Sequence, residues 1–348
     1  MHMSDALLSP AVGGAFCAGS LGVIVYCARK LKQKTDEKII PLMGVLGAFI
    51  FAAQMINFTI PGTGSSGHLG GGMILAVILG PYAAFIVMAS VLTIQALFFA
   101  DGGLLALGCN IWNLGIYPCF IVYPLIFKPL VPAGSNPKKI AIASMISGVA
   151  VLQLGAFSVV IETLLSGRSE LPFETFIYMM LPIHLAMGFM EGFITAGVIN
   201  FVRSARPEIL ESVSISKDIS PGISLKNVAA GFLILAVVTG GALSWFASSA
   251  PDGLEWAIEK VSGSPESPEQ KKNITHALKQ IQEKTAFLPD YSFKNGDEAS
   301  AKEKSKEAWP NIAADTSVSG ITGAIMVLSL IVVFGLLIKT AKKFKVKN

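Results

Sequence analysis

The sequence is poor in charge. Only 14% of its 348 residues are Asp, Glu, Lys or Arg, while 52% are apolar; soluble domains carry about 25% charged residues. This composition excludes a disordered chain, a nucleic-acid-binding arm and an ordinary soluble enzyme. Long runs without charge are typical of helices that cross a lipid bilayer. The sequence therefore predicts an all-α polytopic membrane protein with no nucleic-acid partner.

Cysteines and nucleotide-binding motifs are also scarce. The four cysteines, Cys17, Cys27, Cys109 and Cys119, lie in apolar runs and form no C-x-x-C pair. We interpret them as small packing residues, and a disulfide framework or thiolate metal cage is not expected. The pattern G-x-x-x-x-G-K-[ST] does not occur, so the chain is not itself a P-loop ATPase. No nucleophile–base pair is evident, which makes an enzyme the least favoured class.

Apolar runs of about 17 to 25 residues predict about nine transmembrane helices. They lie near 11–28, 40–58, 69–81, 83–100, 104–127, 139–166, 174–202, 227–248 and 319–338. The third run is short and ends at the helix-breaking pair Gly80-Pro81, so it is either a half-span or part of the fourth. No positively charged region precedes the first run, which we therefore expect to stay in the mature protein.

The basic residues indicate the orientation. Short cytoplasmic loops are rich in Lys and Arg. With the N-terminus outside, the inner segments hold 17 of the 27 basic residues, and the short outer loops hold only Arg168. The other nine lie in 249–318, a segment too long for its charges to set the orientation. We expect a multi-pass protein of the cell (inner) membrane, with the N-terminus outside and the C-terminus in the cytoplasm.

The polar stretches divide the chain. Residues 203–226 are rich in charge, Ser and Pro, and predict a cytoplasmic linker between a seven-helix module, 1–202, and a two-helix module, 227–348. Between the last two spans, 249–318 is a polar insert with apolar residues at helical spacing. It predicts a small, partly helical extracytoplasmic domain.

Two of the four histidines, His2 and His68, fall on the predicted outer face. His68 lies in a glycine-rich segment, 61–72, that contains G-x-G-x-x-G. That pattern indicates a dinucleotide site only between a strand and a helix, whereas here it joins two membrane spans. We interpret the segment as backbone that folds inward and allows a backbone or ligand to approach closely.

The first two residues offer nitrogen donors for a metal. Because His2 is large, we expect Met1 to be retained with a free amine. The amine, the His2 amide nitrogen and Nδ1 of His2 can bind one metal in fused five- and six-membered rings. Ni²⁺ and Cu²⁺ promote the required loss of the amide proton in square-planar nitrogen fields. His68 is the candidate for the fourth position. The alternative is that His2 is a frayed end and His68 an ordinary loop residue.

Several stretches resemble one known family. Residues 1–10, 64–72, 95–110 and 184–195 resemble, in order, the substrate-capture component of nickel/cobalt energy-coupling factor (ECF) transporters, the NikM/CbiM type. In the second module, 251–255 (PDGLE) follows a span and resembles the signature of the small companion subunit. The chain therefore looks like a fusion of the two components.

The resemblance implies a transporter subunit that captures Ni²⁺ or Co²⁺ at the outer face and needs no other cofactor. The implied ligands are the amine of Met1, the amide nitrogen and ring of His2, and His68. The implied partners are a transmembrane coupling (T) protein and a cytoplasmic ATP-binding-cassette ATPase, and the fused module resembles a loading or coupling device. A planar field of four nitrogens favours nickel, with low-spin Co²⁺ as the alternative.

Polar residues near the spans could orient these ligands without touching the metal. The candidates are Asp5, Ser66, Gln95, Asp101, Asn110 and Asn113. His184 and Glu191 are seven residues apart and share a helix face, where we favour interhelical hydrogen bonds over metal binding.

The alternative function is a stand-alone secondary transporter or channel for a cation. It requires an intramembrane acidic relay, inverted repeats or broken helices. Only Glu162 and Glu191 are deep acidic candidates, and the sequence shows no repeat. A metal-sensing receptor would need a cytoplasmic output domain, for which the inner loops are too short.

Overall fold

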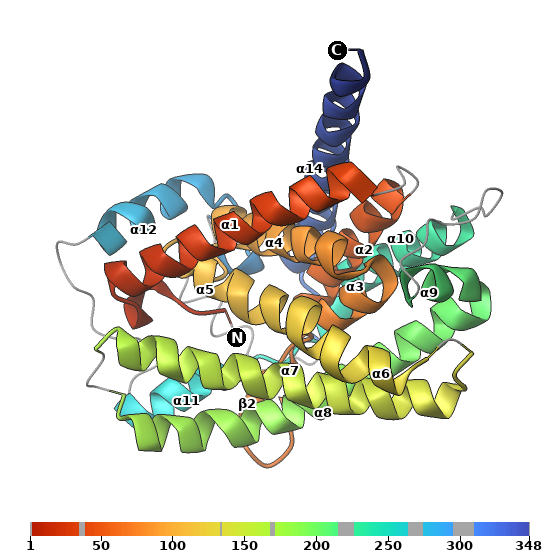
Figure 1. Ribbon diagram of the computed structural model, residues 1–348. Helices are drawn as coiled ribbons and strands as arrows, with labels where there is room; N and C mark the ends of the chain where they lie inside the picture. The colour runs from red at the N-terminus through yellow and green to blue at the C-terminus, as the bar shows by residue number, and fades with distance from the viewer. Residues whose placement is uncertain are drawn as a thin grey trace.

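The computed structural model describes residues 2–34, 39–132, 134–167, 171–214, 226–263, 274–294 and 310–347. Within them the chain is almost entirely helical (Figure 1). The helices are η1 (Asp5–Leu7), α1 (Pro10–Lys34), α2 (Ile39–Gln54), α3 (Gly72–Leu79), α4 (Pro81–Phe98), α5 (Leu107–Ile111), η2 (Trp112–Phe127), α6 (Lys128–Leu130), α7 (Pro137–Leu165), α8 (Phe173–Ala205), α9 (Pro207–Ser214), α10 (Lys226–Gly241), η3 (Leu243–Phe246), α11 (Gly253–Ser262), α12 (Ile274–Thr285), η4 (Pro289–Tyr291) and α14 (Ala314–Lys347).

Six described helical stretches are long and apolar enough to cross a membrane. They are Pro10–Gln33, Pro81–Phe98, Leu107–Leu130, Pro137–Leu165, Phe173–Ala205 and Ala314–Thr340, and the shorter Ile39–Gln54 and Lys226–Gly241 are also apolar. This confirms the predicted all-α membrane protein. The run 69–81 yields only the eight residues of α3, about 12 Å of helix. Of the two alternatives, a half-span or a part of the next helix, the structure shows the half-span. Glycines precede α3, and Gly80-Pro81 separates it from α4.

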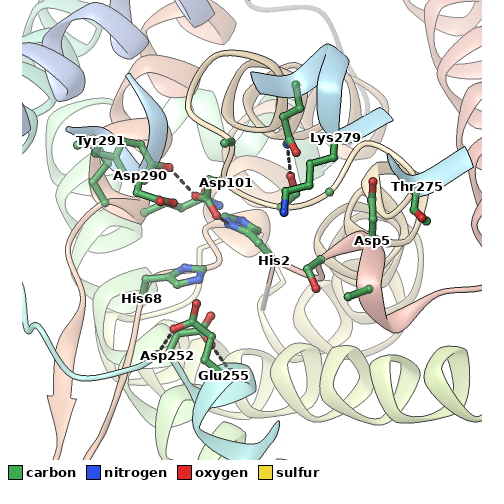
Figure 2. A pocket seen from close by; sticks show the side chains of 18 of the residues that line it. His2, Asp5, His68, Asp101, Asp252, Glu255, Thr275, Lys279, Asp290 and Tyr291 are labelled. Atoms are coloured by element: carbon green, nitrogen blue, oxygen red, sulfur yellow. Dashed lines mark hydrogen bonds and ion pairs between the residues drawn. The ribbon is translucent and has the colours of Figure 1, made fainter. Parts of the chain in front are cut away.

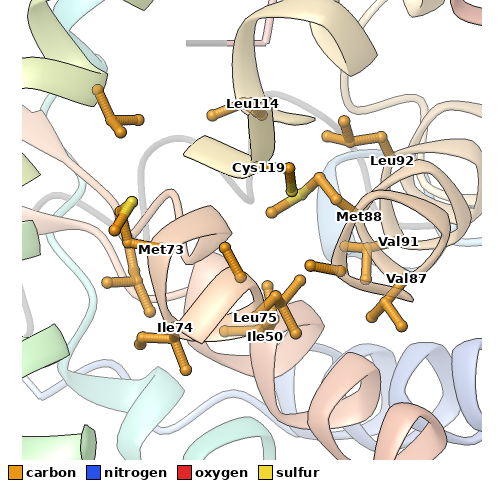
Figure 3. Packing of buried hydrophobic residues seen from close by; sticks show 14 of the residues in the cluster. Ile50, Met73, Ile74, Leu75, Val87, Met88, Val91, Leu92, Leu114 and Cys119 are labelled. Atoms are coloured by element: carbon orange, nitrogen blue, oxygen red, sulfur yellow. The ribbon is translucent and has the colours of Figure 1, made fainter. Parts of the chain in front are cut away.

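The short helix α3 lies at the centre of the first half of the chain. All eight of its residues are buried, as expected for a helix that is apolar on every side. Figure 3 shows Met73, Ile74 and Leu75 of α3 packed among Ile50 of α2 and side chains of α4 and η2. Because α3 is enclosed, the segment leading into it, which contains His68, is also held inside the protein.

A β-hairpin precedes α3. Strand β1 (Phe58–Ile60) pairs antiparallel with β2 (Ser65–Gly67). The turn between them contains Gly62 at φ 78° and Gly64 at φ 75°, values that glycine adopts without steric cost. From Ser65 onward the chain is buried as far as α3. The glycine-rich segment therefore folds inward as predicted.

Helices α7 and α8 lie side by side (Figure 1). Their backbones approach so closely that a Cβ atom on Gly148 would stand 2.5 Å from the Gly192 nitrogen. Small residues at such crossings let membrane helices pack tightly. This packing fixes the face of α8 that carries Glu191.

The second half of the chain packs directly on the first. Helices α10 and α14 lie against α2, and α11 lies against α8. Helix α11 begins with a capping box in which Asp252 accepts from Leu254 N and Glu255 N. The described parts of 249–318 are thus partly helical, as predicted, and in contact with the first half. The linker prediction falls partly on 215–225, outside the described residues, and the module boundaries stay a prediction.

Candidate metal centre

The N-terminal segment is fixed by the loop that follows α4. The Met3 amide donates to Asn110 Oδ1 at 2.8 Å, and the Met3 carbonyl accepts from Gly103 N at 2.9 Å. Asp5 Oδ1 accepts from Leu105 N and Ala106 N at 2.8 and 3.0 Å. Met3 is fully buried. His2 is therefore held by its neighbours and is not a frayed end.

His68 lies between β2 and α3 and is buried. Its Nδ1 lies 3.1 Å from the Leu69 carbonyl oxygen. The next peptide groups are held from both sides, because Gly70 N and Gly71 N donate to Glu191 at 2.7 and 2.9 Å, and Gly70 O accepts from Gln54 at 2.8 Å. The turn that presents His68 is thus tied to α2 and α8.

The structure brings the rings of His2 and His68 together (Figure 2). Their centroids are 5.0 Å apart with an angle of 36° between the planes. Nδ1 of His2 lies 2.7 Å from Asp101 Oδ1, whereas its Nε2 is buried and makes no hydrogen bond in the described part of the protein. The chelate predicted from the sequence uses Nδ1, so a metal would have to displace Asp101 from this nitrogen.

Asp101 also connects the site to the second half of the chain. Its Oδ2 accepts from the Tyr291 hydroxyl at 2.5 Å, and the Tyr291 ring stacks on Phe99 with centroids 5.1 Å apart. Tyr291 and Asp290 have φ angles of 60° and 47°, a region that costs energy for residues other than glycine. A strained turn of the second half is therefore held against the candidate site.

The electrostatic setting suits a neutral imidazole beside a carboxylate. Burial lowers the pKa of His68 to about 3, so its ring is neutral at physiological pH, as a metal ligand must be. Burial by itself would raise the pKa of Asp101, but the charge of His2 and the hydrogen bonds from His2 and Tyr291 lower it to about 2. Asp101 is therefore ionised next to His2.

A cavity of about 690 Å³ surrounds the two rings. The first half of the chain lines it with His2, Asp5, His68 and Asp101, and the second half adds Asp252, Glu255, His276, Lys279, Gln282, Asp290 and Tyr291. Burial and the charge of Asp252 raise the pKa of Glu255 to about 7. Access to the rings therefore depends on both halves.

The structure separates the predicted supporting residues into two groups. Asp101 and Asn110 contact the N-terminal segment, and Asp5, which belongs to that segment, accepts from Leu105 N and Ala106 N. Gln95 supports the His68 turn indirectly. It donates to Gln54 Oε1 at 2.9 Å, and Gln54 in turn donates to the Gly70 carbonyl. Ser66 and Asn113 bind other groups. Met1 lies outside the described residues, so its amine stays a prediction.

Two of the supporting candidates bind other partners. Ser66 Oγ donates to the Ala250 carbonyl at 2.7 Å, which attaches β2 to the second half of the chain. Asn113 donates to Glu162 at 3.0 Å, within a separate buried network. Neither contact includes His2 or His68.

Sequence reasoning missed Gln54 and Tyr291, and it did not identify the groups that Glu191 binds at the start of α3. Interhelical hydrogen bonds were expected for His184 and Glu191. His184 instead bonds the Met180 carbonyl of its own helix, and Glu191 bonds backbone amides of the His68 turn. The burial of a charged residue was a usable signal for Glu191, but its partner is distant in sequence.

Among the described residues no group of three or more His, Cys, Asp or Glu side chains could hold a metal.

Two family models match the chain. The model described as "Cobalt uptake substrate-specific transmembrane region" (CbiM) matches residues 2–209, and the PDGLE domain matches residues 226–340. The matches meet near the predicted linker. They agree with the resemblance stated from the N-terminal, glycine-rich and PDGLE motifs.

Individual proteins are similar to the whole chain or to its first part. A protein of Archaeoglobus fulgidus named as a fused nickel transport protein, NikMN, is 32% identical over 95% of this chain and 96% of its own length. A cobalt transport protein CbiM of Sorangium cellulosum is 28% identical over 64% of this chain and its whole length. The crystal structure of a transition metal transporter, 32% identical, covers 60% of this chain and 95% of its own with a TM-score of 0.52. The chain therefore belongs to the CbiM family of metal-uptake membrane proteins and carries a PDGLE subunit fused in the same polypeptide.

Proposed function

We propose that the chain captures Ni²⁺, with Co²⁺ as the alternative cargo, at the outer face for uptake by an ECF-type transporter. The donors are the Met1 amine, the His2 amide nitrogen and ring, and His68. The observation that carries this proposal is the 5.0 Å separation of the His2 and His68 rings in a buried site. Since a bond from imidazole nitrogen to a metal is about 2 Å long, the two rings can reach one ion with small rotations.

Chelation changes the partner of His2. Nδ1 now faces Asp101 Oδ1 at 2.7 Å, and the six-membered chelate ring requires this nitrogen. Metal binding therefore replaces the His2–Asp101 hydrogen bond and removes protons from Nδ1 and the amide. The Asp101 carboxylate stays close enough to balance part of the metal's charge.

The full uptake cycle needs partners. The chain contains no phosphate-binding loop motif, so ATP hydrolysis is assigned to a separate ATPase, coupled through a T protein. Relatives named for nickel or cobalt transport support a metal-transport subunit, and the partner proteins are part of the proposal.

The proposal is tested by metal analysis of the purified full chain with an unmodified N-terminus. One Ni²⁺ per chain is expected, with binding lost in His2→Ala and His68→Ala. His184→Ala is the matched control, because His184 is a buried histidine that bonds Met180 and does not line the cavity. Full nickel binding by His68→Ala would refute the proposed site.

Orientation is tested separately. A reporter fused after Asn348 should lie in the cytoplasm, and a tag inserted within 262–272 should be labelled from outside. The expectation comes from the excess of basic residues in the predicted inner segments. Reversed labelling would place both histidines on the wrong side for uptake.

A further inference from the structure

One peptide group joins Glu191 to the ring of His68. The carbonyl of this group belongs to Leu69 and lies 3.1 Å from His68 Nδ1, while its N–H belongs to Gly70 and donates to Glu191 Oε2 at 2.7 Å. The other carboxylate oxygen accepts from Gly71 N at 2.9 Å. A buried carboxylate on α8 therefore acts on the imidazole through a single amide.

The turn has little freedom to change these contacts. Gly71 has φ 75°, and a Cβ atom there would lie 2.7 Å from Ile50. A Cβ atom on Gly72 would lie 2.4 Å from Pro118. Gln54 holds the opposite side of the turn through the Gly70 carbonyl. The distance from carboxylate to imidazole is thus set by packing as well as by hydrogen bonds.

The chemistry of the contact determines the tautomer of His68. A carbonyl oxygen only accepts hydrogen bonds, so Nδ1 must be the protonated nitrogen and Nε2 carries the lone pair. The hydrogen bond that Glu191 accepts from Gly70 N polarises the amide and strengthens its carbonyl as an acceptor. In metal sites, a hydrogen bond from the distal ring nitrogen to a carboxylate or carbonyl orients the imidazole and raises its basicity.

We propose that Glu191 is a positioning residue for His68, holding the imidazole through the Leu69–Gly70 peptide as the Nδ1–H tautomer and presenting Nε2 to the metal. This inference rests on the proposed function, because it assumes that His68 is a metal ligand. In this proposal a residue of the membrane-spanning helix α8 orients His68, a ligand near the outer face.

Glu162 provides a matched control. It is a fully buried carboxylate on α7, and it accepts from Asn113 and Ser158 at 3.0 and 3.1 Å. None of these contacts reaches the His68 turn. Glu191→Gln and Glu162→Gln each replace a buried carboxyl group by an amide, and only the first alters the link to His68.

The first measurement is the Kd for Ni²⁺, obtained by chelator competition on the purified full chain. Glu191→Gln should bind about 10- to 100-fold more weakly, the usual cost of losing an outer partner of a ligand, because its NH₂ group opposes one of the two amide N–H groups. Glu162→Gln should stay within about twofold of wild type. Glu191→Asp keeps the carboxyl group and should recover part of the loss. Wild-type affinity in Glu191→Gln would overturn the proposal.

The second measurement needs no variant at residue 191. The ¹⁵N shifts of the histidine rings in the metal-free wild type should show His68 as the Nδ1–H tautomer, with its signals identified by their absence in His68→Ala. The Nε2–H tautomer would overturn the proposal, even if Glu191→Gln cannot be purified in folded form. If His68→Ala binds nickel normally, the proposed function fails. If His68→Ala loses nickel and Glu191→Gln binds it normally, this inference alone fails.

Discussion

His2 and His68 reach the same cavity but are held by different parts of the molecule. His2 lies near a chain end, and a loop after α4 holds its segment through Met3 and Asp5. His68 lies in a glycine turn held by side chains of α2 and α8. The first proposed ligand thus depends on how the N-terminal segment binds this loop, and the second depends on how helices pack.

The two ligands also differ in their relation to the second half of the chain. Tyr291 reaches His2 through Asp101. The His68 turn is held by Gln54 and Glu191 of the first half, and Ser66, just before it, is bonded to Ala250 and Pro251 of the second half. Changes at Tyr291 should therefore act on His2 rather than on the turn that holds His68. The site thus has two arms: the His2 arm, held by the loop after α4, and the His68 arm, held by Gln54 and Glu191. Variants should affect the two arms differently.

An uncleaved N-terminal extension should have the largest effect. It converts the proposed amine donor into a secondary amide, so nickel stoichiometry should fall close to zero. The same extension at the C-terminus is the control and should leave one metal per chain. Full nickel loading of a protein that retains its N-terminal extension would show that the amine is not a ligand.

Gly71→Ala should damage the His68 arm most. The substitution places a Cβ atom at positive φ and 2.7 Å from Ile50, adding overpacking of about 1–3 kcal/mol to backbone strain of about 1–2 kcal/mol. Gly62→Ala carries similar strain at φ 78° with no atom within 4 Å. Thermal unfolding in detergent should therefore rank Gly71→Ala well below Gly62→Ala. Equal stabilities would contradict the packing described for the turn.

Asn110→Ala should weaken the His2 arm. Asn110 satisfies both the amide and the carbonyl of Met3, at 2.8 and 3.3 Å, so its loss should reduce nickel affinity by about 10- to 100-fold. Asn113→Ala is the control, because Asn113 bonds Glu162 away from the site. It should lower thermal stability and leave the Kd for nickel within about twofold. The opposite ranking of the two Kd values would remove Asn110 from the support of His2.

Tyr291→Phe should have the smallest effect. It removes one hydroxyl that donates to Asp101, and a hydrogen bond to a charged group contributes about 1.5–3 kcal/mol when buried. Because Asp101 is partly exposed and acts on the metal only through His2, we expect a loss of affinity of about threefold to tenfold. Tyr117→Phe, which removes a hydroxyl bonded to Ser158, should leave affinity unchanged. A larger effect of Tyr117→Phe would break the link between Tyr291 and the site.

The sequence predicted those features that depend on local pattern. Charge-free runs located the membrane helices, and the glycines before α3 together with Gly80-Pro81 explain why one run is a half-span. The meeting of His2 and His68 followed from their shared face and from the family resemblance. Each of these depends on composition, spacing or a recognisable motif.

The partners of those histidines could not be predicted in the same way. Glu191 and Tyr291 lie far along the chain from the groups they bind, Gly70 and Asp101, and no periodicity connects them. Asn113 was predicted to support the metal ligands because it lies near the predicted outer loop. It instead donates to Glu162, in a different buried network. Long-range contacts between polar side chains and backbone depend on tertiary packing that one sequence does not reveal.

Nickel K-edge X-ray absorption of the loaded wild-type protein tests the central proposal most directly. Four nitrogen donors in a planar arrangement are expected, with the multiple-scattering signal of two imidazoles, and His68→Ala should retain too little nickel to give this signal. A six-coordinate shell rich in oxygen, a sulfur donor, or an imidazole signal unchanged in His68→Ala would contradict the site built from Met1, His2 and His68.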